Sequence, residues 1–470
     1  MLRRREIHVH LYSLITLLVL GMLLAGCGGN SGSTPMSSNS NGSNSAQTGE
    51  AFVVGTDAPV AGVVSFDVVL QSITATDANN NQVSLLSGSP SVDFARFNGL
   101  QTLLDLNDVP AGTYSKVTIT LGQGTIGYLN VQPGSAPAIQ TEPATFSTNV
   151  VPVTLSAPLV VSQTEPVGLH LDFDLHKSIQ VTNGQITGTV NPTFNVTAVT
   201  PSDPGSYLDE FDAGVTSVNA AGQSFQIQGP HGRMLTVDVN GQTEFDNNEN
   251  LASLSTSSIV QISGTLDRAD STIDADEVAI LSQDGFYASG QVTYVQPSSG
   301  AATDFDLYVR GLLPASTGLS LGQIAQVNLS GSEKYFIYRM HNPLTEFVFN
   351  QSLLLPGQHI SVGGPASGAS NPQAVTVKRV VLRHWGFNGQ VIAGSVSPGS
   401  SSFQMNVTGF AGLLVPGPVT VYVDGATYRM GLTDINSLSS ATSIRVVGLL
   451  IKDPVSGDPV ILAHYIDAMS

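Results

Sequence analysis

Three acidic residues of the chain could bind a hard cation. Asp172 and Asp174 alternate with apolar residues, so in a β-strand both carboxylates project from one face. Asp57 follows an earlier apolar run and could supply a third carboxylate. Because Ca²⁺ prefers oxygen ligands, Asp57, Asp172 and Asp174 are the candidate metal ligands. The alternative is that these acids cap turns or pair with Lys177, since no Asp-rich loop supplies further ligands. Apart from Ca²⁺, no cofactor is expected.

Four aromatic residues form a second candidate site. Tyr335 and Tyr338 lie in the run YFIYRMH, and Trp385 and Phe387 lie in the run HWGF. Exposed aromatic rings contribute strongly to the binding of sugars and partner proteins. We therefore consider Tyr335, Tyr338, Trp385 and Phe387 as binding residues. Core packing and contact between neighbouring units are the alternative interpretation.

The sequence carries no catalytic signature. Ser263 and Ser289 precede glycines where strands end and lack the context of a strained GxSxG turn. His170 and His176 are six residues apart, which is about 20 Å along a strand and too far for a shared metal. We expect a binding or structural protein that is not an enzyme. The alternative is a hydrolase or carbohydrate-binding protein acting on envelope or extracellular polysaccharide, because carboxylate pairs are recognised only by their separation in space.

The single cysteine of the 470 residues, Cys27, indicates where the protein works. An apolar run from Leu11 to Leu24 follows three arginines and is short for a membrane-spanning helix, which is typical of a signal peptide. The sequence LAGC that ends at Cys27 resembles the lipobox of bacterial lipoproteins. This resemblance implies cleavage of residues 1–26 and lipidation of Cys27. An ordinary secretory signal is the alternative.

Charge limits the partners of the exported chain. Without residues 1–26 the chain has 14 basic and 34 acidic residues, a net charge of −20. Such a chain has no basic patch for nucleic acid, and an anionic membrane would repel it. We therefore expect attachment to the membrane through the lipid, with envelope proteins or polysaccharide as partners. The expected location is the bacterial cell envelope, at the outer membrane, on its periplasmic face or at the cell surface.

The chain that must position these residues has an all-β pattern. Residues 27–50 are rich in Gly, Ser and Asn and predict a flexible tether. Beyond them, apolar and polar residues alternate repeatedly between Gly, Pro and Asn turns, as in Val117–Leu121 and Val419–Val423. Short helical turns are expected at most, near Leu100–Leu106 and around Ile435–Leu438.

Residues 51–200 form the first predicted domain. The motifs TDAP at 56–59, PAGTY at 110–114 and LDFD at 171–174 occur in the order seen in a bacterial envelope family, domain-of-unknown-function family 4382. The region resembles that family. The resemblance implies an immunoglobulin-like or transthyretin-like β-sandwich without an assigned activity.

The remaining chain contains a degenerate repeat over 208–284, 285–384 and 385–470. Each unit has five or six predicted strands, one of which ends in glycine at Gly264, Gly363 or Gly448. This number of strands suits a small closed β-barrel, although a solenoid would also stack such repeats. The pattern resembles domain-of-unknown-function family 5666, which implies three barrels in tandem. The middle unit is longer, and we place its insertion between Tyr335 and Gln358.

Overall fold

The computed structural model describes most of the chain beyond the predicted signal peptide and tether. The described residues are 47–470 except 59–61, 98–99, 131–137, 183–184, 267–271, 315–317, 339–347, 366–373, 426, 431–434, 439–442, 454–455 and 470. Cys27 and the tether up to residue 46 lie outside them. The described part is mostly strand, which confirms the all-β class. No helix within it is long and apolar enough to cross a membrane.

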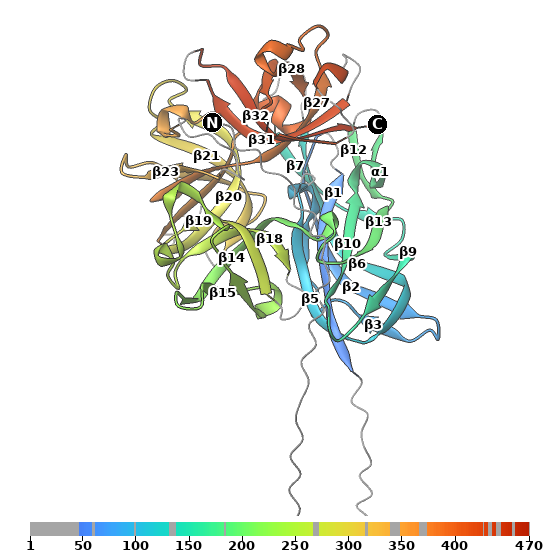
Figure 1. Ribbon diagram of the computed structural model, residues 1–470. Coiled ribbons are helices and arrows are strands. Elements are labelled where there is room, and N and C mark those ends of the chain that lie inside the picture. Colours follow the sequence, from blue (N-terminus) through green and yellow to red (C-terminus); the bar gives the residue numbers. More distant parts are fainter. Residues whose placement is uncertain are drawn as a thin grey trace, which may run out of the picture. The chain divides into compact units, whose positions relative to one another are not determined.

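The N-terminal domain, residues 48–199, has two larger sheets and one small sheet (Figure 1). The first sheet has the order β13 (Phe194–Val199), β10 (Val167–Asp174), β1 (Thr48–Ala58) and β5 (Thr102–Pro110). The second is built on β2 (Val63–Asp77) and β6 (Gly112–Asn130), with β3 (Gln82–Ser84), β4 (Ser91–Asp93), β7 (Ala138–Pro143) and β9 (Val150–Val161) beside them. The small sheet has the order β11 (Ile179–Thr182), β12 (Gln185–Val190) and β8 (Thr145–Phe146).

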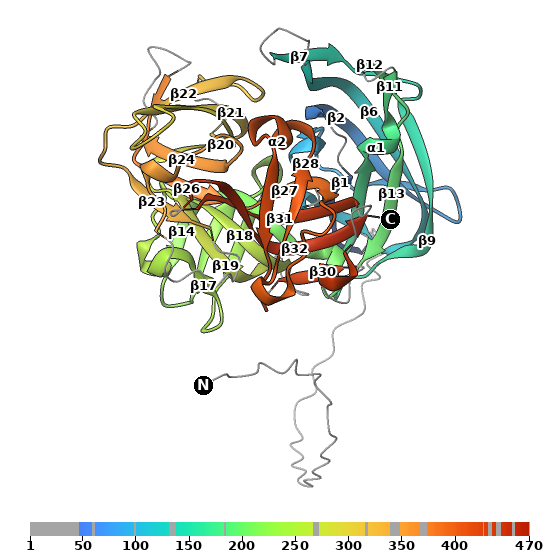
Figure 2. The ribbon, with the colours of Figure 1, turned by 90° about the horizontal axis from the view of Figure 1, so that it is seen from above.

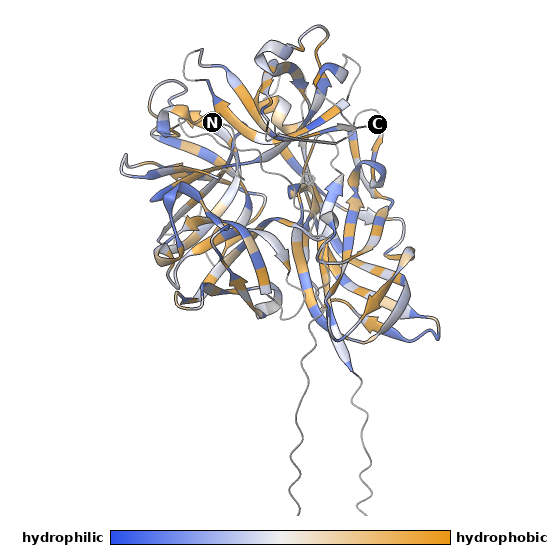
Figure 3. Cartoon of the chain, in the orientation of Figure 1, coloured by the Kyte–Doolittle hydropathy of each residue, from blue (hydrophilic) through white to orange (hydrophobic). Residues whose placement is uncertain are grey.

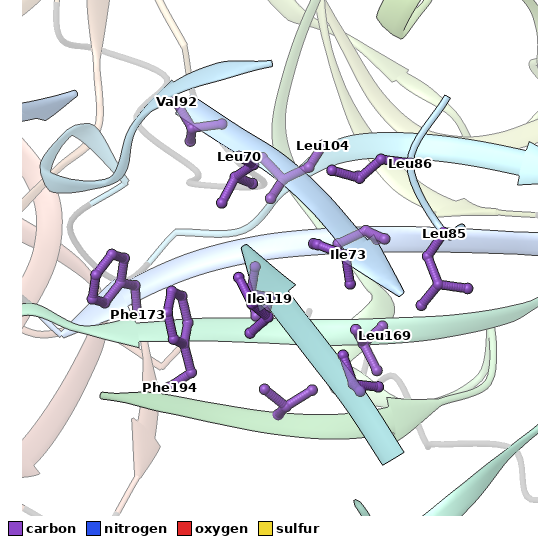
Figure 4. Close-up of a cluster of buried hydrophobic side chains, with 14 of the residues drawn as sticks. Leu70, Ile73, Leu85, Leu86, Val92, Leu104, Ile119, Leu169, Phe173 and Phe194 are labelled. Atoms are coloured by element: carbon purple, nitrogen blue, oxygen red, sulfur yellow. The ribbon is translucent and has the colours of Figure 1, made fainter. Parts of the chain in front are cut away.

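The two larger sheets share one hydrophobic core, because each strand turns every second side chain toward the other sheet. Figure 3 shows this alternation of hydrophilic and hydrophobic residues along the strands. Phe173 lies inside the core, with its ring centroid 5.2 Å from Phe66 and from Phe94 and 4.1 Å from Phe194. Figure 4 shows Phe173 and Phe194 beside the buried Ile119 and other apolar side chains of this core.

Two local expectations need correction. Strand β1 begins at Thr48, inside the predicted tether, because Thr48 to Glu50 pair with Pro110 to Asp108 of β5. The helical turn expected near Leu100–Leu106 is instead the beginning of β5, which the pairing with β1 stabilises. The second expected turn, around Ile435–Leu438, is confirmed by a short 3₁₀ helix, η8 (Ile435–Ser437).

The last unit, residues 385–469, closes into a five-stranded barrel (Figures 1 and 2). Antiparallel pairs join its consecutive strands, and a parallel pairing of Thr420–Tyr422 with Val460–Leu462 closes the ring. The ring order is β27 (Trp385–Val391), β28 (Ser402–Val407), β29 (Pro418–Tyr422), β32 (Pro459–Met469) and β31 (Ser443–Lys452). A closed ring leaves no free sheet edge between these strands.

The first unit, residues 208–282, repeats this order of pairings. Its strands are β14 (Leu208–Asn219), β15 (Ser224–Gln228), β16 (Met234–Asp238), β19 (Thr272–Ser282) and β18 (Ile259–Leu266), and β16 again pairs with β19 in parallel. The middle unit, residues 285–383, has β20 (Gly285–Gln296), β21 (Asp304–Leu313), β22 (Ile324–Asn328) and β24 (His359–Pro365), and in place of one last strand it has β25 (Ala374–Thr376) and β26 (Arg379–Arg383). Strand β23 (Lys334–Ile337) pairs in parallel with β26, as β17 (Glu244–Phe245) pairs with β19 in the first unit.

The glycines that were expected to end strands lie inside them, since β18 continues from Gly264 to Leu266 and β31 from Gly448 to Lys452. Their presence there has a steric cause. At Gly448 a Cβ atom would lie 2.2 Å from the carbonyl oxygen of Leu462, and at Gly264 it would lie 2.2 Å from that of Asp274. Both glycines stand at an irregularity in the pairing with the following strand. A side chain there would collide with backbone, so these bends of the strands require glycine.

Part of the extra length of the middle unit lies where the sequence predicted an insertion. Five residues, 246–250, separate β17 (Glu244–Phe245) from η5 (Leu251–Ser253) in the first unit. In the middle unit thirteen residues, 338–350, separate β23 from η6 (Gln351–Leu353).

Candidate functional site

The structure does not bring the three candidate metal ligands together. Strands β1 and β10 are parallel, with Thr56 opposite Asp172 and Asp57 opposite Phe173, so Asp57 projects from the other face of the sheet than Asp172. Asp172 accepts a hydrogen bond from the Asn195 amide at 2.9 Å. Within the described ranges, no group of three His, Cys, Asp or Glu side chains is placed to hold a metal ion.

Asp174 has the capping role of the alternative interpretation. It caps the short helix α1 (Leu175–Ser178) by accepting a hydrogen bond from the Lys177 amide at 3.0 Å, and its other carboxylate oxygen lies 2.7 Å from the Lys177 ammonium. These contacts satisfy the carboxylate without a metal ion.

The four candidate aromatic residues do not form an exposed platform. Tyr338 is fully buried, and its hydroxyl hydrogen-bonds to the Ser263 hydroxyl in the first unit. Trp385 and Phe387 are only 6% and 1% exposed and belong to the core of the last unit. Tyr335 is half-buried against Phe349, with ring centroids 5.8 Å apart. Core packing and contact between units, the alternative interpretation, describe these side chains.

A buried ionic cluster, which no sequence pattern predicted, joins the first and middle units. Arg383, at the end of β26, is 1% exposed. Its guanidinium donates to Glu210 at 2.8 Å and to Asp212 at 3.2 Å, both on β14. It also donates to the hydroxyls of Tyr287 on β20 and Ser361 on β24. The Tyr287 hydroxyl donates in turn to Asp212 at 2.5 Å, so the cluster is continuous.

Burial and pairing act in opposite directions on this cluster. Burial raises the pKa of Glu210, and the Arg383 guanidinium partly offsets this by lowering it. Burial disfavours the charged form of Arg383, but Asp212 and Glu210 together hold its pKa well above the ordinary value. The Tyr287 hydroxyl has a raised pKa because it is buried and thus stays protonated. Loss of one member would therefore leave another buried group without its partner.

A second arginine of the same strand makes a similar connection. Arg379 donates two hydrogen bonds, at 2.9 and 2.8 Å, to the carboxylate of Glu249 in the first unit. Its guanidinium also lies 3.7 Å from the centroid of the Phe336 ring. This planar, two-pronged contact is one that arginine makes and lysine cannot.

A third arginine connects the middle unit to the N-terminal domain and to the last unit. Arg310 is 5% exposed, lies 3.4 Å from Asp93 and stacks 5.0 Å from the centroid of the Trp385 ring. Asp93 also accepts the Phe66 amide at 2.8 Å and stands opposite Asp67 in the pairing of β2 with β4. Burial, and then the charge of Asp93, raise the pKa of Asp67 to about 7.

The N-terminal domain also contacts the first unit. Arg233 forms an ion pair with Glu50 of β1 and donates to the Leu106 carbonyl at 3.3 Å. Phe52 and Leu103, from the face of the first sheet that points away from its own core, join the hydrophobic core of the first unit. Arg383, Arg379, Arg310 and Arg233 thus connect neighbouring units of the fold.

One sequence signal could have indicated these links. Arg379 and Arg383 lie on one face of the strand RVVLR. The other residues of this strand are apolar, which predicts a buried strand in which charged side chains are not exposed to solvent. A charge inside such a strand requires a buried partner. The partners, however, lie about 130 and 170 positions earlier in the chain.

Taken together, the geometry defines a mostly β protein with several sheets and a closed five-stranded barrel near its C-terminus. Residues 48–192 match a family described as Domain of unknown function (DUF4382). Residues 214–279 match a second family, Domain of unknown function (DUF5666). No curated protein matches the chain.

These matches bear out part of the resemblance predicted from the sequence. The first match covers the motifs around Asp57, Tyr114 and Asp172. In the PAGTY motif the Tyr114 hydroxyl donates to the Pro110 carbonyl at 2.7 Å, which fixes the turn between β5 and β6. The second match covers only the first of the three predicted repeats.

Proposed function

We propose that the protein is a lipid-anchored protein of the bacterial cell envelope with a binding or structural role, in which the folded units act as one rigid body. The observation that carries this proposal is the set of buried links at Arg383, Arg379 and Arg310. Each joins units that are separate in the sequence, and removal of either partner would leave a buried charge unpaired. Such links suit a rigid scaffold better than units that move independently.

The same proposal includes the finer architecture. The N-terminal domain is a sandwich of the immunoglobulin or transthyretin type, and the first, middle and last units are three versions of one barrel. Support comes from the repeated order of strand pairings and from the parallel pairing that recurs in each unit: β16 with β19, β22 with β25, and β29 with β32. The glycines at equivalent strand bends, Gly264 and Gly448, support it further.

Fractionation of cells tests the anchor. Cys27→Ser should release the mature chain from the membrane or leave an unprocessed precursor, whereas Ser31→Ala in the tether should remain processed and membrane-bound. The reason is that a chain with net charge −20 has no electrostatic affinity for an anionic surface. A processed, membrane-bound Cys27→Ser protein would contradict the proposal.

Chemical cross-linking in intact cells tests the binding role. Envelope proteins or polysaccharide that co-purify with the wild-type chain should be lost with Cys27→Ser, because the variant is no longer held beside them. Recovery of the same partners with both chains would show that the anchor does not determine the partners.

A further inference from the structure

His384 is the residue that connects the middle unit to the last unit. It stands between Arg383, the last residue of β26, and Trp385, the first residue of β27. Its side chain is fully buried although it lies in a linker. The ring packs edge-on against Tyr338 of the middle unit, with centroids 5.8 Å apart, and against His464 of the last unit, at 5.5 Å. The imidazole therefore fills the space between two units.

The ring of His384 is unsatisfied as a polar group. Neither ring nitrogen has a hydrogen-bond partner among the residues that the structure describes. Its backbone carbonyl, in contrast, accepts a hydrogen bond at 2.9 Å from Nδ1 of His359, which must carry its proton on that nitrogen. An apolar site of this kind tolerates a neutral imidazole. An imidazolium in the same place would be destabilised, because it would lack a compensating contact.

Arginines and another histidine lie around this histidine pair. The pKa of His384 is influenced electrostatically by His464, Arg383 and His359. That of His359 is influenced by groups that include Arg383, Arg310 and Arg96. The carboxylates next to Arg383, on Glu210 and Asp212, are already bound to its guanidinium. Tyr338 faces Glu277, Asp246 and Glu210 and is held protonated by burial.

Burial, and then the nearby His464, Arg383 and His359, hold the pKa of His384 well below its ordinary value of 6.5. Burial, and then Arg383, lower the pKa of His359 in the same way. Both rings are therefore neutral in the closed protein at neutral pH. If the junction opened, water would stabilise the protonated rings, so protons bind to the open form more strongly than to the closed form.

We propose that His384 is an acid-sensitive latch, and that its protonation separates the last unit from the middle unit while each unit remains folded. The proposal adds a regulatory property to the rigid scaffold and does not depend on the anchor or on any partner. Its motivation is the position of a buried, unsatisfied imidazole in the linker, packed between rings of two units.

The chain has a natural reporter of this junction. Trp385, its single tryptophan, directly follows His384, is 6% exposed and packs against the His359 ring at 4.8 Å. Its emission maximum and its quenching by acrylamide should be measured on the detergent-solubilised full chain from pH 7.5 to 4.5, together with far-ultraviolet circular dichroism. Emission intensity is unsuitable, because a protonated His359 would itself quench the indole.

The expected result for the wild type is a red shift of the emission maximum below pH 6.5, with at least a twofold rise in acrylamide quenching and unchanged circular dichroism. His384→Phe keeps the ring contacts and cannot titrate, so its transition should disappear or move down by at least one pH unit. His170→Gln is the matched control. His170 is a partly buried histidine whose pKa is also lowered, but it lies on β10, away from the junction. This variant should open like the wild type.

The proposal fails if Trp385 of the wild type stays buried to pH 4.5, or if His384→Phe opens at the same pH as the wild type. Should His384→Phe not fold, hydrogen exchange of the wild type decides the question. In acid the amides of β27 should lose protection before those of β10 do. Simultaneous loss of protection in both strands would indicate general acid unfolding and overturn the latch.

Discussion

Replacement of Arg383 by methionine should be strongly destabilising, because it removes the cation at the centre of a buried cluster. Glu210 loses its counter-charge, while Asp212 keeps the hydrogen bond from Tyr287 at 2.5 Å. Removal of one partner of a buried ion pair costs about 3–5 kcal/mol, and the contact that Asp212 retains favours the lower end. At ~2–4 °C per kcal/mol for a cooperative unit of 150–250 residues, a loss of about 3 kcal/mol lowers the melting temperature by roughly 6–12 °C.

Scanning calorimetry of the full chain measures this effect against a matched control. Lys378 lies in the same segment and pairs with Asp284 at 3.0 Å, but its side chain is 63% exposed. Because exposed pairs contribute about 0–1 kcal/mol, Lys378→Met should lower the melting temperature by no more than roughly 4 °C. Equal shifts for Arg383→Met and Lys378→Met would refute the assignment of the cluster as a structural link.

Two further measurements separate the charge from the loss of packing. Without Arg383, burial and the charge of Asp212 keep the folded-state pKa of Glu210 above its unfolded value, so the variant should lose stability as pH rises through that range. The defect of Arg383→Met should thus be larger at pH 7.5 than at pH 5. Addition of Glu210→Gln and Asp212→Asn should recover more than half of the lost stability at pH 7.5. A triple variant as unstable as the single one would show that packing, and not charge, is responsible.

The remaining predictions concern a strand bend and a carboxylate pair. Gly448→Ala, whose Cβ would lie 2.2 Å from the Leu462 carbonyl oxygen, should destabilise the last unit by about 2 kcal/mol or more in chemical denaturation. Gly399→Ala, with open space around the added Cβ, should change it by less than ~1 kcal/mol, and equal effects would contradict the steric argument. Since the pKa of Asp67 is raised to about 7, its stabilising contribution is present in acid and lost as pH rises through 7. Asp67→Asn should therefore raise the melting temperature at pH 8 more than at pH 5, and an equal change at both values would exclude this role.

Several features of the protein follow from its sequence because they depend on neighbouring residues. The alternation of apolar and polar residues predicted an all-β chain, since the side-chain period of two belongs to the strand itself. The recurring glycines indicated a repeat from the order of residues alone, because Gly264 and Gly448 meet the same steric requirement inside their strands. The lipobox at Cys27 is likewise a local signal, and it remains a prediction.

The tertiary structure decided which side chains meet. Asp57 and Asp172 are both acidic and close to each other in the fold, yet the register of β1 against β10 places them on opposite faces of the sheet. Trp385 is of a residue type that is common in binding sites. It is nevertheless buried, because the barrel of the last unit closes around it. Arg383 finds Glu210 across about 170 positions of chain. The register of the strands, the closure of the barrel and the pairing of distant residues are set by the packing of whole sheets. No short stretch of the sequence contains that information.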